Sequence, residues 1–574
     1  MNTVAEHRPE RSIVHRSTFD RIFALCIVNC AWCISLFANT YYASPTGSSS
    51  AACTLEAPGT LASAFSKMTS ATAPTSWDNA HEVVLLPGSY SVGSTLTFNR
   101  NYLALRSQSG DSADVVLYGP GGTTNRRALN AANYYVRVSG ITVSNFYCTG
   151  DGGAITCSGK RPLFSDCLFI KNSEKLGGGV AAYGTFENCR FLSNTASGNG
   201  GALFHSSASN CVFAFNKGNS GGACNDVTLT DCILTNNTAT GDGGACYSCT
   251  AQNCRMLNNT ASKAGGACSR GTYTGCVFVG NRTYTEGGGG YYYTFTDCVF
   301  TNNTAAGDGG ACLGTGYVAR RCEFVGNRSG IKSDGTTQAK SGGACSRGTY
   351  YDCRFIANLN PTQNGGGLYY GNAYDCVFIG NTGKSGGGTY LEASGKALRC
   401  VFEGNGANDG GAAYQGVYEN CLFDGNSSSG AGTIAFAISK ATMRNCTVVN
   451  NRGVNAAAGN ASSYLNTLFH GNTPYDIGSS ATANATLYGS LKSGVTLTGS
   501  GNIRSSEPLF NLGRYPSYPD YALLPKSPAR DKGSAYTYAD PIDLAGNGRL
   551  YGPAIDIGCY ELWPVALPTR LFVR

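Results

Sequence analysis

Charged residues are scarce in this chain: they make up 13% of its 574 residues, and the formal net charge is +7. The basic residues are scattered, with no run that could follow a phosphate backbone, which argues against nucleic-acid binding. Only five histidines are present, and His81, His205 and His470 do not stand near a nucleophile pattern. Paired Cys/His spacings typical of metal sites are also lacking, so we expect no metal and no cofactor.

Residues that favour helices are few as well. The chain has 78 glycines and lacks the leucine framework of leucine-rich repeats. What it has instead is a repeat, Cys-x-apolar-x-x-Asn, most copies of which start 21 to 25 residues apart, and a fixed period of this length indicates a repeat architecture. The cysteines of the repeat, called the cysteine column below, are Cys167, Cys189, Cys211, Cys232, Cys254, Cys276, Cys298, Cys322, Cys353, Cys376, Cys400, Cys421 and Cys446.

Each copy alternates between apolar and variable positions. The cysteine and the aromatic residue two positions on would face one side, while the residue between them varies freely, which is the pattern of a strand. The asparagine suits a bend because it tolerates a left-handed backbone, and a Gly-Gly pair before the next strand marks a second bend. A third apolar column lies three residues before each cysteine, so each copy holds three short strands and three bends.

These features predict an all-β fold, a right-handed single-stranded parallel β-helix of roughly 17 rungs of about 22 residues. Rungs stacked at about 4.8 Å would make a rod about 80 Å long. The right hand follows the general handedness of parallel crossovers. The step from Cys322 to Cys353 is 31 residues, which predicts a loop inserted near 329–340, and a fourteenth copy, Thr467–Asn472, has lost its cysteine.

Twenty-six cysteines would usually suggest disulfides in an exported protein. We interpret the cysteine column instead as buried free thiols that act as small apolar fillers. Residues stacked in register lie about 4.8 Å apart with parallel Cβ directions, whereas a disulfide needs Cβ atoms roughly 3.8 Å apart. Disulfide pairing is the alternative, and a thiol titration separates the two.

The chain divides into five parts. Residues 1–40, a basic stretch followed by the apolar run 22–38, are expected to be a signal peptide, or an uncleaved N-terminal anchor in a membrane. Residues 41–80 would form a polar linker and an N-terminal cap with a short helix at 61–68. The β-helix would occupy 81–505, followed by a C-terminal cap at 506–562 and a tail at 563–574.

Two resemblances extend this reading. The Gly-Gly-Ala-apolar units, such as Gly243-Gly244-Ala245-Cys246, and the Phe-x-x-Asn units resemble the repeats of chlamydial polymorphic outer-membrane proteins. That resemblance implies a right-handed β-helix displayed at the cell surface, with an adhesive role. The C-terminal part is similar to the choice-of-anchor Q group of exported bacterial β-helices, through the segments Glu507–Phe510, Ser527–Gly533, Asp543–Arg549 and Ile555–Glu561.

Many right-handed β-helices cleave polysaccharides, so an enzyme is the main alternative. Lyases of this shape use clustered Asp for calcium and a basic residue as base, and hydrolases use paired carboxylates. Asp151, Asp242, Asp308 and Asp409 stand just before Gly-Gly, where aspartate favours a turn, so we assign no catalytic residue. A polysaccharide lyase or glycoside hydrolase, and a passive stalk or coat, stay as alternatives.

Tyrosines recur just after the Gly-Gly pairs. Outward tyrosines at rung spacing would form a flat apolar stripe with polar tips, which suits sugar rings or protein partners. The other explanation is that tyrosine is a common residue on sheet surfaces. We expect a secreted or cell-surface protein, monomeric and without catalysis, that binds a glycan or another cell surface. The candidate binding residues are Tyr291, Tyr292, Tyr293, Tyr369, Tyr370, Tyr390 and Tyr414.

Overall fold

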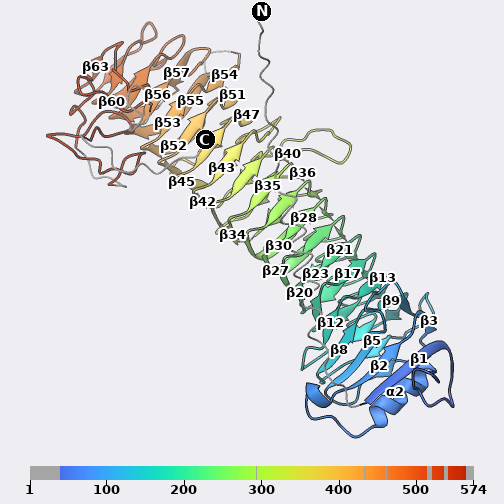
Figure 1. The fold of residues 1–574 in the computed structure, drawn as a ribbon. Helices are drawn as coiled ribbons and strands as arrows, with labels where there is room; N and C mark the ends of the chain where they lie inside the picture. Colours follow the sequence, from blue (N-terminus) through green and yellow to red (C-terminus); the bar gives the residue numbers. More distant parts are fainter. Residues whose placement is uncertain are drawn as a thin grey trace, which may run out of the picture.

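The computed structural model describes residues 39–292, 294–431, 435–460, 462–512, 520–535 and 541–563. The chain is a parallel β-solenoid of about 18 turns, with 3% helix, as the repeat predicted. Figure 1 shows the strands stacked as rungs along one rod, from the N-terminal rungs in blue to the C-terminal rungs in orange and red. The expected signal peptide or anchor lies almost wholly in residues 1–38, outside the described ranges.

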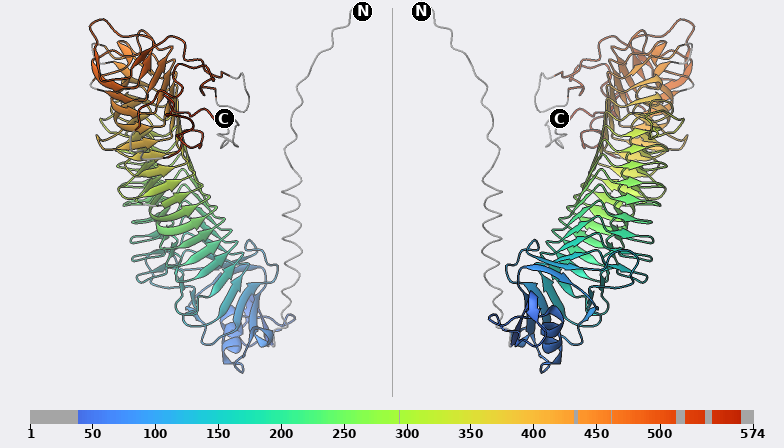
Figure 2. Two further views of the ribbon diagram at one scale, coloured as in Figure 1. Left: turned by 90° about the vertical axis from the view of Figure 1, so that its left-hand side faces the viewer. Right: turned by 90° about the vertical axis from the view of Figure 1, so that its right-hand side faces the viewer.

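One turn of the solenoid contributes strands to three sheets. In the rung of Cys276, β30 (Cys268–Thr274) belongs to sheet A, β31 (Val277–Val279) to sheet B and β32 (Arg282–Thr283) to sheet C. Each strand pairs in parallel with its counterpart one rung on, and Figure 2 shows this stack from two sides. Equivalent residues therefore form columns: the ring centroids of Phe278 and Phe300, inside the rod, are 4.4 Å apart.

The Gly-Gly pairs form a tight bend in successive rungs. The first glycine adopts a left-handed backbone, with φ +73° at Gly265, which side chains other than glycine rarely adopt. The second glycine is required by the close approach of the next rung, because a Cβ at Gly266 would lie 2.1 Å from Gly288 O. The sequence thus fixes both the direction of the bend and the spacing of the rungs at this corner.

The cysteine column lies at the bend between sheets A and B. The thiols reach the carbonyl two positions earlier, as Cys276 Sγ does at 3.4 Å from Thr274 O. The Cys276 backbone N–H donates to the sulfur of the next rung, Cys298 Sγ, at 3.4 Å. In the fourteenth copy, Thr467 Oγ1 donates to Leu465 O at 3.1 Å, so a hydroxyl replaces the thiol in the same place.

The asparagine column is buried, which corrects the role expected for it. The left-handed residue of the bend is the preceding one, Gly280 with φ +64°, while Asn281 is fully buried. The Asn281 side-chain amide donates to Asn303 Oδ1 (2.9 Å) and to Met256 O (2.8 Å), and Asn303 Oδ1 also accepts the Asn281 backbone N–H. The same ladder continues from Asn172 to Asn472. The spacing of the asparagines in the sequence predicted where the bend lies, but it could not show which way the asparagine side chain points.

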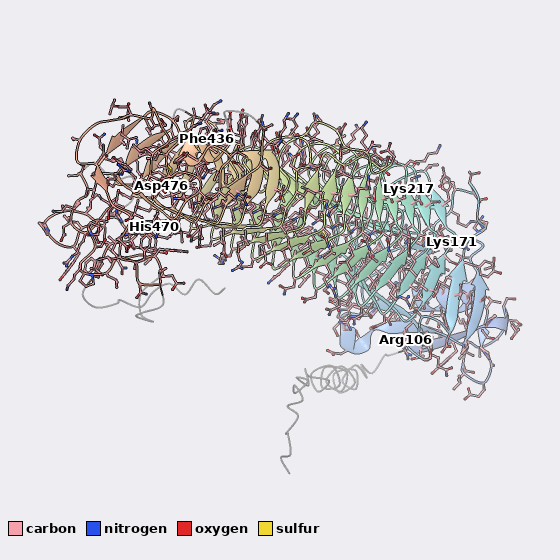
Figure 3. The ribbon with its side chains drawn as sticks, turned by 90° about the horizontal axis from the view of Figure 1, so that it is seen from above. Arg106, Lys171, Lys217, Phe436, His470 and Asp476 are labelled. Carbon is pink, nitrogen blue, oxygen red and sulfur yellow. The ribbon has the colours of Figure 1, made fainter. Side chains whose placement is uncertain are left out.

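The ladder ends on a carboxylate near the C-terminal end of the rod. Asn472 Nδ2 donates to Asp476 Oδ1 at 2.8 Å, and Asp476 Oδ2 accepts the backbone N–H groups of Gly489 and Ser490. Asp476 is labelled in Figure 3, which shows the rod from above with its side chains. The buried carboxylate therefore takes up the last amide of the ladder, and no further asparagine is needed there.

The N-terminal end is covered by a helix, but the linker expected before it is a strand. β1 (Asn39–Ser48) pairs in parallel with β2 (His81–Leu85), so residues 41–47 are part of sheet A. The polar composition of this segment suggested a linker. An edge strand with one face exposed has the same composition, so composition could not distinguish the two. α2 (Leu61–Ser70) is capped by Thr60 and buries its apolar face, with the rings of Phe65 and Phe98 5.0 Å apart.

The described part of 506–562 lies along the side of the rod, although the sequence suggested a cap over its end. Leu422 and Leu468, outward residues of sheet B, form a second apolar core with Phe510 and Ile557. His470, labelled in Figure 3, has its ring 5.7 Å from that of Phe510. Prolines and aromatics showed that the rung pattern stops here, but they could not indicate which surface the segment covers.

Candidate functional site

Three of the candidate tyrosines lie in one outward column of sheet A. Tyr369 pairs in register with Tyr390, and Tyr390 with Tyr414, so three consecutive rungs present a tyrosine at the same place. The residue before each tyrosine is buried, and successive strand residues face opposite sides, which turns the tyrosines outward. The strands are β44 (Leu368–Tyr369), β48 (Thr389–Tyr390) and β52 (Ala413–Glu419).

With Tyr370 these residues form what we call the tyrosine cluster. The rings of Tyr390 and Tyr414 stack with centroids 4.6 Å apart, and Tyr369 lies 4.0 Å from Tyr370 and 5.5 Å from Tyr390. Burial raises the pKa of Tyr369 and Tyr390, so their phenols are protonated at neutral pH and can donate or accept hydrogen bonds. Lys440 Nζ donates to Tyr414 Oη at 2.6 Å and places a positive charge at the edge of the cluster.

Tyr291 and Tyr292 form a separate pair. Their ring centroids are 4.5 Å apart, and Tyr292 is 43% exposed. Two rungs, which carry Leu313 and Ser346 in the same column, lie between this pair and the tyrosine cluster. The single stripe expected from the sequence is therefore interrupted, and Tyr293 lies outside the described residues.

Tyr370 and Tyr292 both occupy a left-handed bend, with φ +54° and +53°. Tyrosine is uncommon in this conformation, and strained residues gather at functional sites. The equivalent bend holds Arg270, Arg347 and Gln415 in other rungs, also with positive φ. The conformation is therefore a property of the repeat and carries no functional argument by itself.

A hollow of about 100 Å³ adjoins the cluster. It lies where the bend of one rung is longer than that of its neighbour, because residues 391–395 separate β48 from β49 (Lys396–Leu398). Gly395 N donates to Glu392 O at 2.9 Å and closes this longer bend. A ring, an amide and a carboxylate from two rungs meet in the hollow, whose lining is Tyr370, Gly371, Asn372, Glu392, Ser394 and Gly395.

Sequence reasoning missed a second aromatic group on sheet A. Tyr351 and Tyr374 stack with centroids 5.0 Å apart, and the guanidinium of Arg320 lies 4.2 Å from the Tyr351 ring centroid. Tyr374 is two residues beyond Asn372 on β45 (Asn372–Tyr374), so it faces the same side as the hollow. Both tyrosines stand two positions before a cysteine of the column, a spacing that could have identified them.

The cysteine column has a structural place in the fold. All of its cysteines, from Cys167 to Cys446, are buried thiols along the bend between sheets A and B. Burial raises the pKa of the Cys376 and Cys421 thiols, which favours the neutral form over the reactive thiolate. The oxidation state of the column in the isolated protein stays a prediction.

The aspartates before the Gly-Gly pairs tie neighbouring rungs together. Asp242 Oδ1 accepts the backbone N–H of Ala264 at 3.0 Å, and Asp308 Oδ1 accepts that of Ser341 at 2.7 Å. These bonds satisfy backbone donors at a bend, in agreement with the turn role that the sequence indicated.

A group of charged side chains on neighbouring rungs bears on the alternative that the protein is a polysaccharide lyase or hydrolase. Burial raises the pKa of Glu286, the nearby charge of Asp308 adds to the rise, and Lys340 and Arg347 oppose it. Asp308, Lys340 and Arg347 therefore all lie close enough to Glu286 to affect its ionisation. Among the described residues, no group of three or more His, Cys, Asp or Glu side chains is placed to hold a metal ion.

In the described part of the chain, no helix has the length and apolar character needed to cross a membrane.

Comparison with known proteins gives a repeat type. Several solved structures align with the chain over most of its length. They include the pectate lyase Pel9A (13% identity, 92% of this chain and 96% of that one, TM-score 0.16) and the PL6 family alginate lyase AlyGC (9%, 81% and 100%, 0.29). A third is the catalytic unit of the GH87 alpha-1,3-glucanase from Streptomyces thermodiastaticus (13%, 77% and 68%, 0.18). At these identities and TM-scores they carry no argument about activity. Among curated proteins, none matches the sequence.

The match to a family model is confined to the repeats. Residues 188–206, 231–249 and 297–315 match the Chlamydia polymorphic membrane protein repeat. Each matched segment begins next to a cysteine of the column and ends beyond the following Gly-Gly, so it covers the strand of sheet B and the corner after it. A repeat of this type suggests a surface protein. The chain is a parallel β-solenoid that carries Chlamydia polymorphic membrane protein repeats.

Proposed function

We propose that this protein works at the cell surface or outside the cell and binds a glycan through the tyrosine cluster and the adjoining hollow. The observation that carries the proposal is the in-register column of Tyr369, Tyr390 and Tyr414 on consecutive rungs, next to a hollow with Tyr370 and Glu392 in its wall. The location is supported by the repeat type.

The arrangement suits an extended oligosaccharide that lies along the rod. Because the faces of Tyr390 and Tyr414 stack on each other and Lys440 Nζ lies over the Tyr414 ring, these residues offer a sugar their ring edges and hydroxyl groups, and each such aromatic contact contributes on the order of 1 kcal/mol. The Asn372 amide and the Glu392 carboxylate can bond sugar hydroxyls from the side. Because the cluster belongs to a rigid sheet, little conformational freedom is lost when the ligand binds.

A polysaccharide lyase or hydrolase is the second candidate, and the observation that favours it is the grouping of Glu286, Asp308, Lys340 and Arg347. The hollow itself contains a single carboxylate, Glu392, whereas a hydrolase needs two. Cleavage of a bound glycan that is lost in Glu286→Gln or Asp308→Asn would favour the enzyme over the binding protein.

The proposal is tested by screening the full chain against a panel of glycans, alongside the triple variant Tyr370→Ser/Tyr390→Ser/Tyr414→Ser. Three rings at about 1 kcal/mol each predict binding weaker by about 100-fold. Tyr247→Ser is the matched control, since Tyr247 stands in the same column of sheet A far from the cluster, and it should bind as the unmodified protein does. Unchanged binding by the triple variant, or no binding by the unmodified protein, would leave the tyrosines as ordinary sheet surface.

A further inference from the structure

Two outward columns of sheet A stand four and two residues before the cysteines of the cysteine column. In the rungs of Cys189 through Cys298 these columns contain threonine, serine and glutamine, with Glu187 as the exception. In the rungs that follow, basic and aromatic residues enter the same columns: Arg320, the two stacked tyrosines next to it, and Lys396. Only 13% of the chain is charged, so charge that begins where the aromatic residues begin calls for an explanation beyond the repeat.

At the tyrosine cluster itself, a basic residue stands on either side. Arg347 occupies the bend one rung before Tyr370, and Lys440 Nζ lies 5.0 Å from the centroid of the Tyr414 ring. Both basic side chains are exposed. The bond of Lys440 to the Tyr414 hydroxyl leaves the other N–H donors of the ammonium group for a ligand. A ligand on the cluster therefore lies between two positive charges.

Two more basic residues lie beyond the hollow. Lys396 directly follows Gly395 in the wall of the hollow, and its backbone N–H donates to Asn372 Oδ1 at 2.9 Å. Because this bond occupies the oxygen of Asn372, the amide nitrogen of the same side chain is left to donate to a ligand. The guanidinium of Arg320 lies 4.2 Å from the Tyr351 ring centroid, and an arginine stacked in this way keeps its in-plane N–H donors for other partners.

The basic residues of sheet A differ from those of the neighbouring bend in having no acidic partner. At the bend toward sheet B, Arg321 and Arg399 donate two hydrogen bonds each, of 2.6 to 3.0 Å, to Asp297 and Asp375. The described part of the chain places no carboxylate within ion-pair distance of the four basic residues around the cluster and the hollow. Their charges are therefore available to a ligand.

The acids near this face do not balance its basic residues. Glu392 is exposed in the wall of the hollow, and Asp352 is exposed at the bend toward sheet B, where it acts on Arg321. Asp308 stands at the corner before the cluster, together with Lys340. An excess of positive charge is left on sheet A, in the rungs of the tyrosine cluster and of the second aromatic group.

We infer that the glycan bound by the tyrosine cluster is an acidic one, whose carboxylate or sulfate groups contact Arg320, Lys396 and Lys440. The inference rests on the proposed glycan binding and adds the class of sugar to it. Both acidic groups accept paired bonds from a guanidinium and charge-assisted bonds from an ammonium group, so the shared chemistry is that of an oxyanion.

The distances along the rod suit an oligosaccharide of this class. Five successive strand pairings lead from the rung of Arg320 to that of Lys440, which is about 24 Å at about 4.8 Å per rung. A ligand that lies along sheet A can therefore meet a positive charge at each end of the site. The Glu392 carboxylate lies between these ends and accepts bonds from hydroxyl groups, so the acidic groups belong on either side of the hollow.

Matched pairs of glycans test the inference. The full chain is titrated with a uronic-acid oligosaccharide and its methyl ester, and with a sulfated oligosaccharide and its desulfated form. Exposed charge contacts predict that the acidic form of at least one pair binds about 10-fold more tightly than the neutral form. The difference should shrink as the salt concentration rises, because salt screens exposed charges. The pair with the larger difference shows whether the group is a carboxylate or a sulfate.

Substitutions show which charges are responsible. Arg320→Gln/Lys396→Gln should lose most of the preference for the acidic form, whereas Arg190→Gln/Arg255→Gln, which removes two exposed charges from sheet B, should keep it. Equal binding of both forms by the unmodified protein, or a preference that survives Arg320→Gln/Lys396→Gln, would overturn the inference and leave the proposed glycan binding intact. If neither form of any glycan binds, the proposed function itself fails, and the inference fails with it.

Discussion

At the scale of single residues, the buried asparagines hold the rungs together. Each side-chain oxygen accepts two bonds from the preceding rung, and each amide nitrogen donates to a carbonyl of that rung and to the next asparagine. Spacing in the sequence predicted the place of these residues correctly. Their inward orientation could not be predicted, because the backbone conformation of the residue before them decides it.

Replacing one asparagine of the ladder should cost several bonds at once. In Asn281→Ala, the two donors of Asn259 lose their acceptor and Met256 O loses its donor, so we expect a loss of about 3 kcal/mol or more in the free energy of unfolding. The neighbouring substitution Asn302→Gly should be close to neutral, since Gly280 holds the same left-handed place one rung earlier. Urea unfolding measures both, and a small effect at Asn281 would show that the ladder contributes little.

The positions of the cysteine column should tolerate substitution better than those of the asparagine ladder. Thr467 keeps the bond of the column with a hydroxyl, so Cys298→Thr should fold and keep most of its stability. Cys298→Ala loses the sulfur that accepts Cys276 N–H, and we expect it to be less stable by on the order of 1 kcal/mol. Titration of the denatured, unreduced protein should find many free thiols, whereas near-complete pairing would mean that the column is oxidised.

At the scale of elements, buried acids in the segment along sheet B should make its attachment depend on pH. Burial raises the pKa of Glu561 to about 8 from its ordinary 4.5, with the charge of Asp556 adding to the rise. A raised folded-state pKa favours the protonated acid, so this stabilisation is complete below about pH 4.5 and is lost as the pH rises through about 8.

Hydrogen exchange can follow this attachment directly. The amides of Gly558 and Cys559 donate to Asn466 O (2.9 Å) and Thr447 Oγ1 (3.0 Å) of the rod. After correction for intrinsic rates, both should be better protected at about pH 6 than at about pH 9. Glu561→Gln, which cannot ionise, should reduce this difference, and protection that rises with pH in the unmodified chain would contradict the assignment.

The elements also show where sequence reasoning stopped. Helix α2 was expected close to its observed place because its apolar residues precede the first rung. Residues 391–395 appear in the sequence only as a longer step between two cysteines, yet their fold creates the hollow at Tyr370. The shape of a loop depends on the rungs that lie beside it. The sequence pattern of a single rung therefore could not predict a site that two rungs form together.

At the scale of the whole molecule, one repeated unit produces a rod with unlike faces. The inward columns of Cys, Phe and Asn recur in nearly every rung and made the fold predictable from the sequence. The outward columns are free to differ: sheet A carries threonines and then tyrosines, while sheet B is apolar. The proposed binding site lies in those outward columns, where the repeat imposes nothing and only the register of the rungs shows which residues become neighbours.

The most direct test of this account is the place where a bound glycan lies. A crystal structure of the protein with a bound oligosaccharide from the glycan panel should show sugar rings against Tyr369, Tyr390 and Tyr414, with hydroxyl groups directed toward Asn372 and Glu392. A sugar found instead beside Glu286 and Asp308, or anywhere away from sheet A, would contradict the account.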